Sequence, residues 1–134
     1  RKIELGTEWI SDRDLDEALG NLEVPYSESP KVSVIIPTYG KLSVVASCLR
    51  SISKYPPRVP IEVIVVEDCS GDADIDRLAD VPGLRYEKNA KNLGFTLSCN
   101  RAANFARGEF IYFLNNDTHV LDGWLDALLE TFAS

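Results

Sequence analysis

Apolar residues occur along this chain with two kinds of spacing. Short continuous apolar runs, which predict buried strands, lie at 32–36, 61–66, 84–86 and 110–114. Apolar residues three or four positions apart, which predict helices facing a core, lie at 42–52, 72–80, 95–105 and 124–132. Strands that alternate with helices predict βαβ units and a parallel sheet, and continuous apolarity in the strands predicts that both faces are covered.

Several boundaries and inward-facing positions follow from the same pattern. The first strand is expected to stop at Pro37, and Gly108 is expected to end the 95–105 helix. Six helix side chains are expected to face the core: Leu97, Ala102, Ala103, Ala106, Trp124 and Phe132.

The first 30 residues have a different pattern and are interpreted as a separate lead-in. Ser11 and Asp14 have the spacing of a capping box, and apolar residues at helical spacing predict a short helix near 12–21. Proline and serine residues at 25–30 predict a linker. We therefore expect an N-terminal extension over 1–30 and an α/β domain over 31–134.

Composition and charge narrow the class of protein. The chain has 134 residues, enough for one modest core, and its 45% hydrophobic and 26% charged residues are typical of a globular protein. The net charge of −7 argues against a nucleic-acid partner, which would require a basic face. The chain begins with Arg1, lacks Met and opens without a signal-peptide pattern, so we expect a piece of a longer polypeptide.

Cysteine usage indicates a reducing compartment. Cys48, Cys69 and Cys99 form an odd set without CxxC spacing, so a disulfide framework is not expected. Cys48 stands among apolar residues and is interpreted as a small core residue. The single His119 is expected in a partly exposed loop, and with scattered cysteines it does not make a zinc site.

Polar residues gather where the predicted strands end. They occupy positions 38–40, 67–68, 89–92 and 115–117. The carboxyl ends of parallel strands lie at one edge of a sheet, where open α/β folds bind their ligands. The sequence therefore predicts a binding site there.

Asp117 is the most informative of these residues, because it follows the apolar run 110–114 directly. The chain has neither a Gly-x-Gly fingerprint nor a P-loop, so phosphates would need another means of binding, such as a divalent cation held by Asp117. Capping of a following helix explains Asp117 equally well on spacing alone. The pair Glu67–Asp68 is open to the same two interpretations, as a helix cap or as acceptors for a ligand's hydrogen-bond donors.

Four motifs in order resemble the family 2 glycosyltransferases, which are inverting enzymes with the GT-A fold. They are Val-Ser-Val-Ile-Ile-Pro-Thr-Tyr-Gly at 32–40, the strand and acidic pair at 61–72, Asn-x-Gly-Phe at 92–95 with Ala-Arg-Gly-Glu-Phe at 106–110, and Asn-Asn-Asp-Thr at 115–118 before Gly-Trp-Leu. The resemblance covers about residues 31–133. It implies the Rossmann-like, nucleotide-binding half of a GT-A domain, with about four mostly parallel strands.

The resemblance also implies a donor site for a nucleoside-diphosphate sugar, with UDP- or dTDP-linked sugars expected. Its nucleotide-binding residues would be Pro37, Thr38, Tyr39, Glu67, Asp68, Asn92, Gly94, Asn100, Arg101 and Asn116. Asp117 and Asn115 would hold Mn²⁺ or Mg²⁺ on the diphosphate. The acceptor would be a saccharide or a lipid-linked glycan in cell-surface polysaccharide synthesis. We expect a cytoplasmic protein, at the inner face of the membrane in its full-length form.

Two departures from the family pattern matter. Glu67 stands where the family usually has Asp, which gives a longer reach, and Asn115 replaces a carboxylate, which should weaken metal affinity. The family mechanism is direct displacement by an acceptor hydroxyl, which needs a general base. The family places that base in the second half of the domain, so we assign none here and expect the isolated chain to be inactive.

Three alternatives stay open on the sequence. A receiver-type signalling domain would also place acidic residues at strand ends, but a strand precedes the acidic pair here and only seventeen residues follow Asp117. A nucleotidyltransferase would open with a Gly-rich basic loop, which 37–41 lacks. A catalytically silent nucleotide-binding module is the third.

Overall fold

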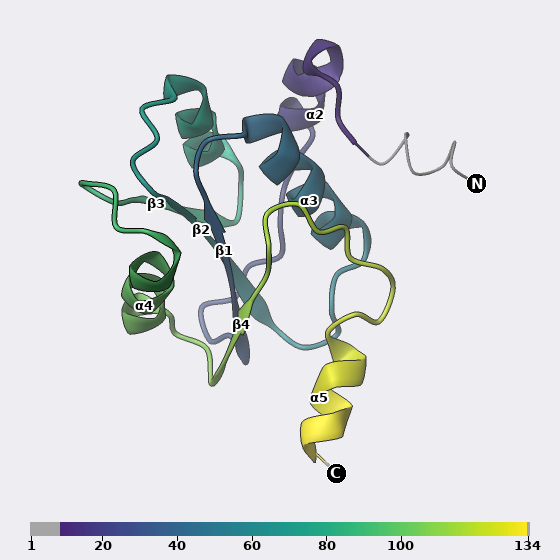
Figure 1. The fold of residues 1–134 in the computed structure, drawn as a ribbon. Coiled ribbons are helices and arrows are strands. Elements are labelled where there is room, and N and C mark those ends of the chain that lie inside the picture. Colours follow the sequence, from purple (N-terminus) through teal and green to yellow (C-terminus); the bar gives the residue numbers. More distant parts are fainter. Residues whose placement is uncertain (1–8, 134) are drawn as a thin grey trace.

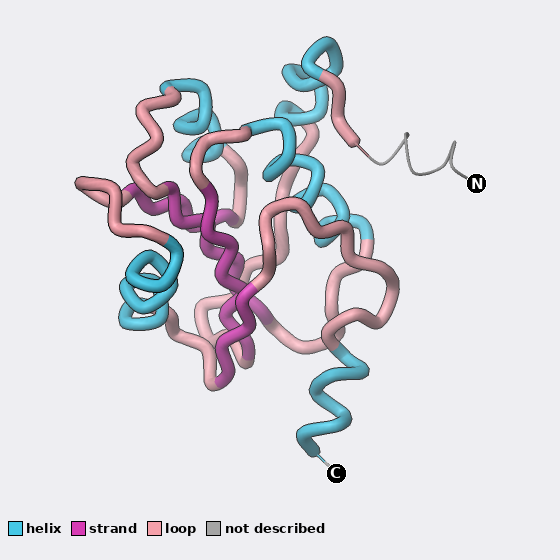
Figure 2. Tube along the Cα trace, in the orientation of Figure 1, coloured by secondary structure: helices cyan, strands magenta, loops and turns pink. Residues whose placement is uncertain are grey.

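The computed structural model describes residues 9–133, in which strands and helices alternate as predicted (Figures 1 and 2). The elements are η1 (Asp12–Asp14), α2 (Leu15–Gly20), β1 (Val32–Thr38), α3 (Leu42–Lys54), β2 (Ile61–Glu67), η2 (Ala73–Asp80), β3 (Leu84–Lys88), α4 (Phe95–Phe105), β4 (Phe110–Phe113) and α5 (Asp126–Ala133). The weak helix predicted at 72–80 is the 3-10 helix η2. None of the described helices combines the length and apolar character needed to cross a bilayer.

The four strands form one parallel sheet in the order β3-β2-β1-β4, which confirms the predicted α/β class. The expectation that β1 stops at Pro37 is wrong, because the strand continues to Thr38. Ile35 accepts a hydrogen bond from Leu114 N on the β4 side, and Pro37 faces the same side two residues later. The β1–β4 pairing ends at Ile35–Phe113, so the missing N–H of Pro37 costs no ladder hydrogen bond.

Helices cover the two faces of the sheet unequally. On one face, α3 and η2 pack on β1 and β2 to form the main core, to which Leu125 and the half-buried Trp124 also belong. On the other face, Ala102 of α4 packs with Ile35, Ile64 and Val66 in a much smaller cluster. Figure 1 shows α4 on the opposite side of the sheet from α3.

Helix α4 has the predicted bounds, but the predicted roles of Leu97 and Gly108 are wrong. Ala102 is buried as expected, whereas Leu97 is 54% exposed and does not face the core. The helix ends at Phe105 with Ala106 as its C-cap, so Gly108 is not its stop signal. A Cβ at position 108 would lie 2.5 Å from Ser33 N, so Gly108 serves the close approach of this loop to β1.

Strand β4 contradicts the expectation that every strand is covered on both faces. Phe110, Ile111 and Phe113 are 38%, 41% and 47% exposed, while Tyr112 packs against the main core. The reason is position: β4 is the edge strand, and α4 packs over β1 and β2. The side chain of Phe132, another predicted core residue, lies outside the part that the structure describes.

The described part of the N-terminal segment packs against the main core. Leu22 and Val24 are buried there, and Val24 N donates to Pro82 O at 3.1 Å. Ile10 N donates to Ser47 Oγ of α3 at 2.9 Å. Residues 9–30 therefore support α3 and η2 directly, although the pattern predicted a separate lead-in.

Candidate functional site

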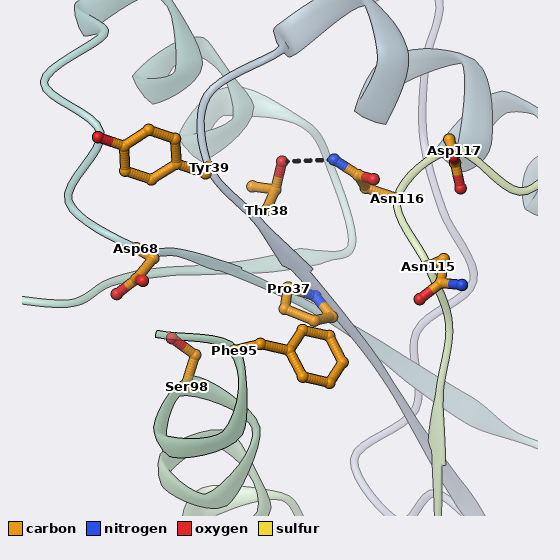
Figure 3. Close-up of a pocket in the computed structure, with 9 residues that line it drawn as sticks. All are labelled: Pro37, Thr38, Tyr39, Asp68, Phe95, Ser98, Asn115, Asn116 and Asp117. Atoms are coloured by element: carbon orange, nitrogen blue, oxygen red, sulfur yellow. Dashed lines mark hydrogen bonds between the residues drawn. The ribbon is translucent and has the colours of Figure 1, made fainter. Parts of the chain in front are cut away.

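The polar residues that follow β1, β2 and β4 lie at the carboxyl end of the sheet, where they border a pocket of about 370 Å³ (Figure 3). The residues that line it are Pro37, Thr38, Tyr39, Asp68, Phe95, Ser98, Asn115, Asn116 and Asp117. Seven of the residues predicted for the site thus lie together, beside Phe95 and Ser98 of α4: Pro37, Thr38, Tyr39, Asp68, Asn115, Asn116 and Asp117.

Asp68 lines the pocket but also organises the loop before α4. Its carboxylate accepts hydrogen bonds from Leu93 N at 2.7 Å, Gly94 N at 2.8 Å and Asn89 Nδ2 at 2.8 Å. Burial by itself raises the pKa of Asp68, but these bonds together with one from Ser98 outweigh it and hold the pKa below its usual value. Asp68 is therefore a carboxylate whose charge is largely satisfied by protein groups.

Glu67 lies behind the pocket and outside its lining. Its side chain is 1% exposed, and its two oxygens accept from Gly40 N at 2.8 Å and Ser70 N at 2.5 Å. Helix η2 is capped by another residue, Asp72, whose side chain accepts from Asp74 N. Of the two interpretations of the acidic pair, neither helix capping nor direct ligand contact describes the position of Glu67.

Two of the predicted residues join the β1 exit to the β4 exit. Asn116 Nδ2 donates to Thr38 Oγ1 at 3.0 Å (Figure 3). Thr38 Oγ1 in turn donates to Gly40 O at 2.8 Å. Pro37 and Tyr39 flank this link, and Tyr39 is 57% exposed at the pocket. The pocket wall here is a hydrogen-bonded unit that bears an accessible aromatic ring.

Asp117 and Asn115 lie beyond that link, with both side chains exposed at the pocket. Thr118 N donates to Asn115 O in a turn, and the next helix begins at Asp126, so the interpretation of Asp117 as a helix cap is wrong. Within residues 9–133, no three imidazole, thiol or carboxylate groups gather into a metal centre. One carboxylate and one amide oxygen fit Mg²⁺ or Mn²⁺ when phosphates and water complete the shell.

The remaining predicted residues surround the pocket without lining it. Asn92 Nδ2 donates to Asp68 O at 3.1 Å, and Gly94 holds a left-handed φ of 87° that directs its N–H to Asp68. Arg101 turns toward β3, where it donates to Asn89 Oδ1 at 3.0 Å and lies 3.8 Å from Glu87. Asn100 is exposed on α4.

Two lining residues were not predicted. Phe95, the first residue of α4, is 61% exposed at the pocket, and Ser98 is buried beside Asn89, whose Nδ2 lies 2.8 Å from Ser98 Oγ. Ser98 had a signal in the sequence, because it is a polar residue on the inward face of the 95–105 helix. Phe95 stands in the Asn-x-Gly-Phe motif, but its exposure follows from the packing of the helix start.

Comparisons with known proteins agree on one family. The sequence model described as "Glycosyl transferase family 2" matches residues 33–134. The chain is 36% identical over 105 residues to the protein named "Uncharacterized protein MT1568" of Mycobacterium tuberculosis, covering 77% of this chain and 33% of that one. It is 32% identical over 95 residues to the poly(ribitol-phosphate) beta-N-acetylglucosaminyltransferase TarS of Staphylococcus aureus, covering 67% and 17%.

A solved structure supports the same relationship. The mannosyltransferase PcManGT from Pyrobaculum calidifontis, in complex with GDP-Man and Mn²⁺, is 25% identical with a TM-score of 0.57. The match covers 78% of this chain and 33% of that one. The chain spans about a third or less of the length of the relatives it matches.

Proposed function

Since this chain belongs to glycosyl transferase family 2, we propose that its pocket binds the nucleoside diphosphate of a sugar donor. The observation that carries the proposal is the exposed Asp117 carboxylate, which lines the same pocket as the β1 exit and the start of α4. The GDP-Man and Mn²⁺ in the structure of the similar mannosyltransferase support this choice of ligand. Family membership sets aside the receiver-type and nucleotidyltransferase interpretations.

Different residues of the pocket suit different parts of the nucleotide and its cation. Tyr39 and Phe95 offer exposed aromatic rings to a base or ribose, and Asp68, which also lines the pocket, offers a carboxylate to a hydrogen-bond donor of the ligand. Asp117 and Asn115 offer oxygen ligands for Mn²⁺ or Mg²⁺ beside the diphosphate. Such a cation supplies charge neutralisation to a departing diphosphate when it is bound.

The wider activity rests on the longer polypeptide. We place this chain as the donor-binding half of an inverting glycosyltransferase that acts on a saccharide or lipid-linked acceptor at the cytoplasmic side of the membrane. The similar GalNAc(5)-diNAcBac-PP-undecaprenol beta-1,3-glucosyltransferase of Campylobacter jejuni, 28% identical over 111 residues, supports a lipid-linked acceptor. The general base and the acceptor site are assigned to residues outside this chain.

Calorimetry with UDP, dTDP and GDP, each with and without Mn²⁺, tests the proposal. Wild type should bind at least one of them more tightly with Mn²⁺, and Asp117→Ala should lose about tenfold or more of that gain because it removes the sole carboxylate proposed as a metal ligand. Its unfolding midpoint should stay near wild type, since an exposed side chain is removed.

Asp122→Ala is the matched control, because Asp122 is an exposed acid in the following loop and outside this pocket. It should bind like wild type. A folded wild-type sample that binds none of the three nucleotides, or an Asp117→Ala variant with undiminished Mn²⁺ dependence, contradicts the proposal.

A further inference from the structure

Glu67 is a buried carboxylate that the proposed ligand contacts do not use. Its side chain is 1% exposed, and no Lys or Arg in the described part of the chain forms a salt bridge with it. A buried charge of this kind is costly unless hydrogen-bond donors surround it. Here the donors are two backbone amides, Gly40 N at 2.8 Å and Ser70 N at 2.5 Å.

The two amides belong to different loops, and both loops hold strained backbone. Among residues 9–133, Lys41 (φ 63°) and Cys69 (φ 58°) are the two non-glycine residues with positive φ. Each is adjacent to an amide that Glu67 binds, Gly40 and Ser70 respectively. Positive φ is costly for residues with a Cβ and persists where the surrounding structure enforces it.

Further hydrogen bonds connect Glu67 to the loop that carries Asp117. Gly40, whose N–H is held by Glu67, accepts at its carbonyl from Thr38 Oγ1 at 2.8 Å. Thr38 Oγ1 in turn accepts from Asn116 Nδ2 at 3.0 Å, one residue before Asp117. One buried carboxylate is thus connected, through the backbone of Gly40 and the Thr38 hydroxyl, to the proposed metal loop.

We infer that Glu67 is a positioning residue: it fixes the loops 38–41 and 68–71 in their strained forms and thereby holds Thr38, Asn116 and Asp117 in place for the ligand. The inference rests on the proposed function for its effect on binding. It also gives a reason for Glu at a position where the family usually has Asp. Asp would withdraw the carboxylate by about 1.5 Å, one carbon–carbon bond, and could not reach both amides.

Two variants test the hydrogen bonds from Gly40 N and Ser70 N to Glu67 in different ways. Glu67→Gln keeps the length but turns an NH₂ group toward one of the amides, and Glu67→Asp keeps the charge but shortens the reach. Both should speed hydrogen exchange at Gly40 N and Ser70 N by about tenfold, the loss expected for a hydrogen bond to a charged acceptor. Both should also weaken Mn²⁺-dependent binding of the nucleoside diphosphate that wild type prefers among UDP, dTDP and GDP, by about fivefold or more.

Glu62→Gln is the matched control. Glu62 is also 1% exposed on β2, but it lies at the other end of the strand, where it accepts from Ser33 Oγ and Arg107 N. This variant should lower global stability while leaving nucleotide affinity and the relative exchange at Gly40 and Ser70 unchanged. It separates a local effect on the pocket from general destabilisation.

The outcomes distinguish the inference from the proposed function. Glu67 variants with wild-type exchange at Gly40 and Ser70 overturn the inference, and so does weaker binding in Glu67→Gln without faster exchange, which would indicate direct ligand contact. If wild type binds no nucleotide, the proposed function fails. Hydrogen exchange at Gly40 N and Ser70 N then decides alone whether Glu67 holds the two loops. If Glu67→Gln does not fold, Glu67→Asp supplies both measurements.

Discussion

Glu67 and Asp68 are neighbours in sequence, yet they serve different loops. Glu67 is the last residue of β2 and Asp68 is the first residue after it, and each carboxylate accepts from its own set of amide donors. This arrangement relieves the repulsion that an adjacent acidic pair would otherwise suffer. Protein groups, four backbone amides and the Asn89 side chain, therefore satisfy most of the charge where β2 ends.

The titration of Asp68 gives a prediction at the scale of one residue. Its folded-state pKa lies below the ordinary value of 3.8, so its hydrogen bonds contribute stability above that pH, which is lost as pH falls through the lowered pKa. Asp68→Asn should reduce the free energy of unfolding at pH 7 by about 1–3 kcal/mol, because an NH₂ group then faces one of the two amides, Leu93 N or Gly94 N, that bind separate oxygens of Asp68.

Chemical denaturation of both proteins between pH 7 and pH 2.5 measures this effect. The stability difference between wild type and Asp68→Asn should be full at neutral pH and should shrink below about pH 3.8. A difference that stays constant down to pH 2.5 would contradict the assigned role of the carboxylate.

At the scale of elements, the edge strand β4 depends on a close backbone approach. Gly108 N donates to Ser33 Oγ at 2.7 Å, and Phe110 N donates to Lys31 O at 2.9 Å as β4 joins β1. The loop before β4 can lie this close to β1 because position 108 has no Cβ. The short strand then delivers Asn115, Asn116 and Asp117 to the pocket.

Gly108→Ala should therefore destabilise the protein. The added Cβ would lie 2.5 Å from Ser33 N and 2.8 Å from Val32 C, and we expect a loss of about 1–3 kcal/mol in the free energy of unfolding. Thermal or denaturant unfolding measures it. Gly20→Ala is the control, because a Cβ added at position 20, the last residue of α2, would meet no neighbouring atom within 4 Å. This substitution should be neutral or slightly stabilising. Equal effects of the two substitutions would refute the close-approach argument.

At the scale of the whole molecule, the N-terminal segment and the α/β unit share one core. Leu22 is 5% exposed in that core, although the family match begins at residue 33. Burial of Leu22 and Val24 against α3 and η2 supports the face of the sheet opposite to α4. Residues that precede the family match thus stabilise the elements that carry the pocket.

Leu22→Ala should accordingly lower the free energy of unfolding by about 2–4 kcal/mol, through lost burial and the cavity left behind. The neighbouring exposed Glu23 is the control, and Glu23→Ala should change stability by about 0.5 kcal/mol or less. Equilibrium unfolding in urea compares the two. A Leu22→Ala variant as stable as Glu23→Ala would mean that this segment does not contribute to the core in solution.

Local sequence patterns were enough to predict the succession of strands and helices, the parallel sheet and the clustering at one sheet edge of the polar residues that follow the strands. These properties follow from local periodicity and from the geometry of parallel strands, which a single chain displays in full. Which polar side chains form hydrogen bonds within the protein depends on contacts between distant segments, and local patterns do not show these contacts. The motifs predicted that Glu67 and Arg101 contact the ligand. In the structure Glu67 accepts from two backbone amides, and Arg101 donates to the side chain of Asn89. Tertiary structure also left β4 exposed and drew Leu22 into the core, because burial depends on which segments meet in space.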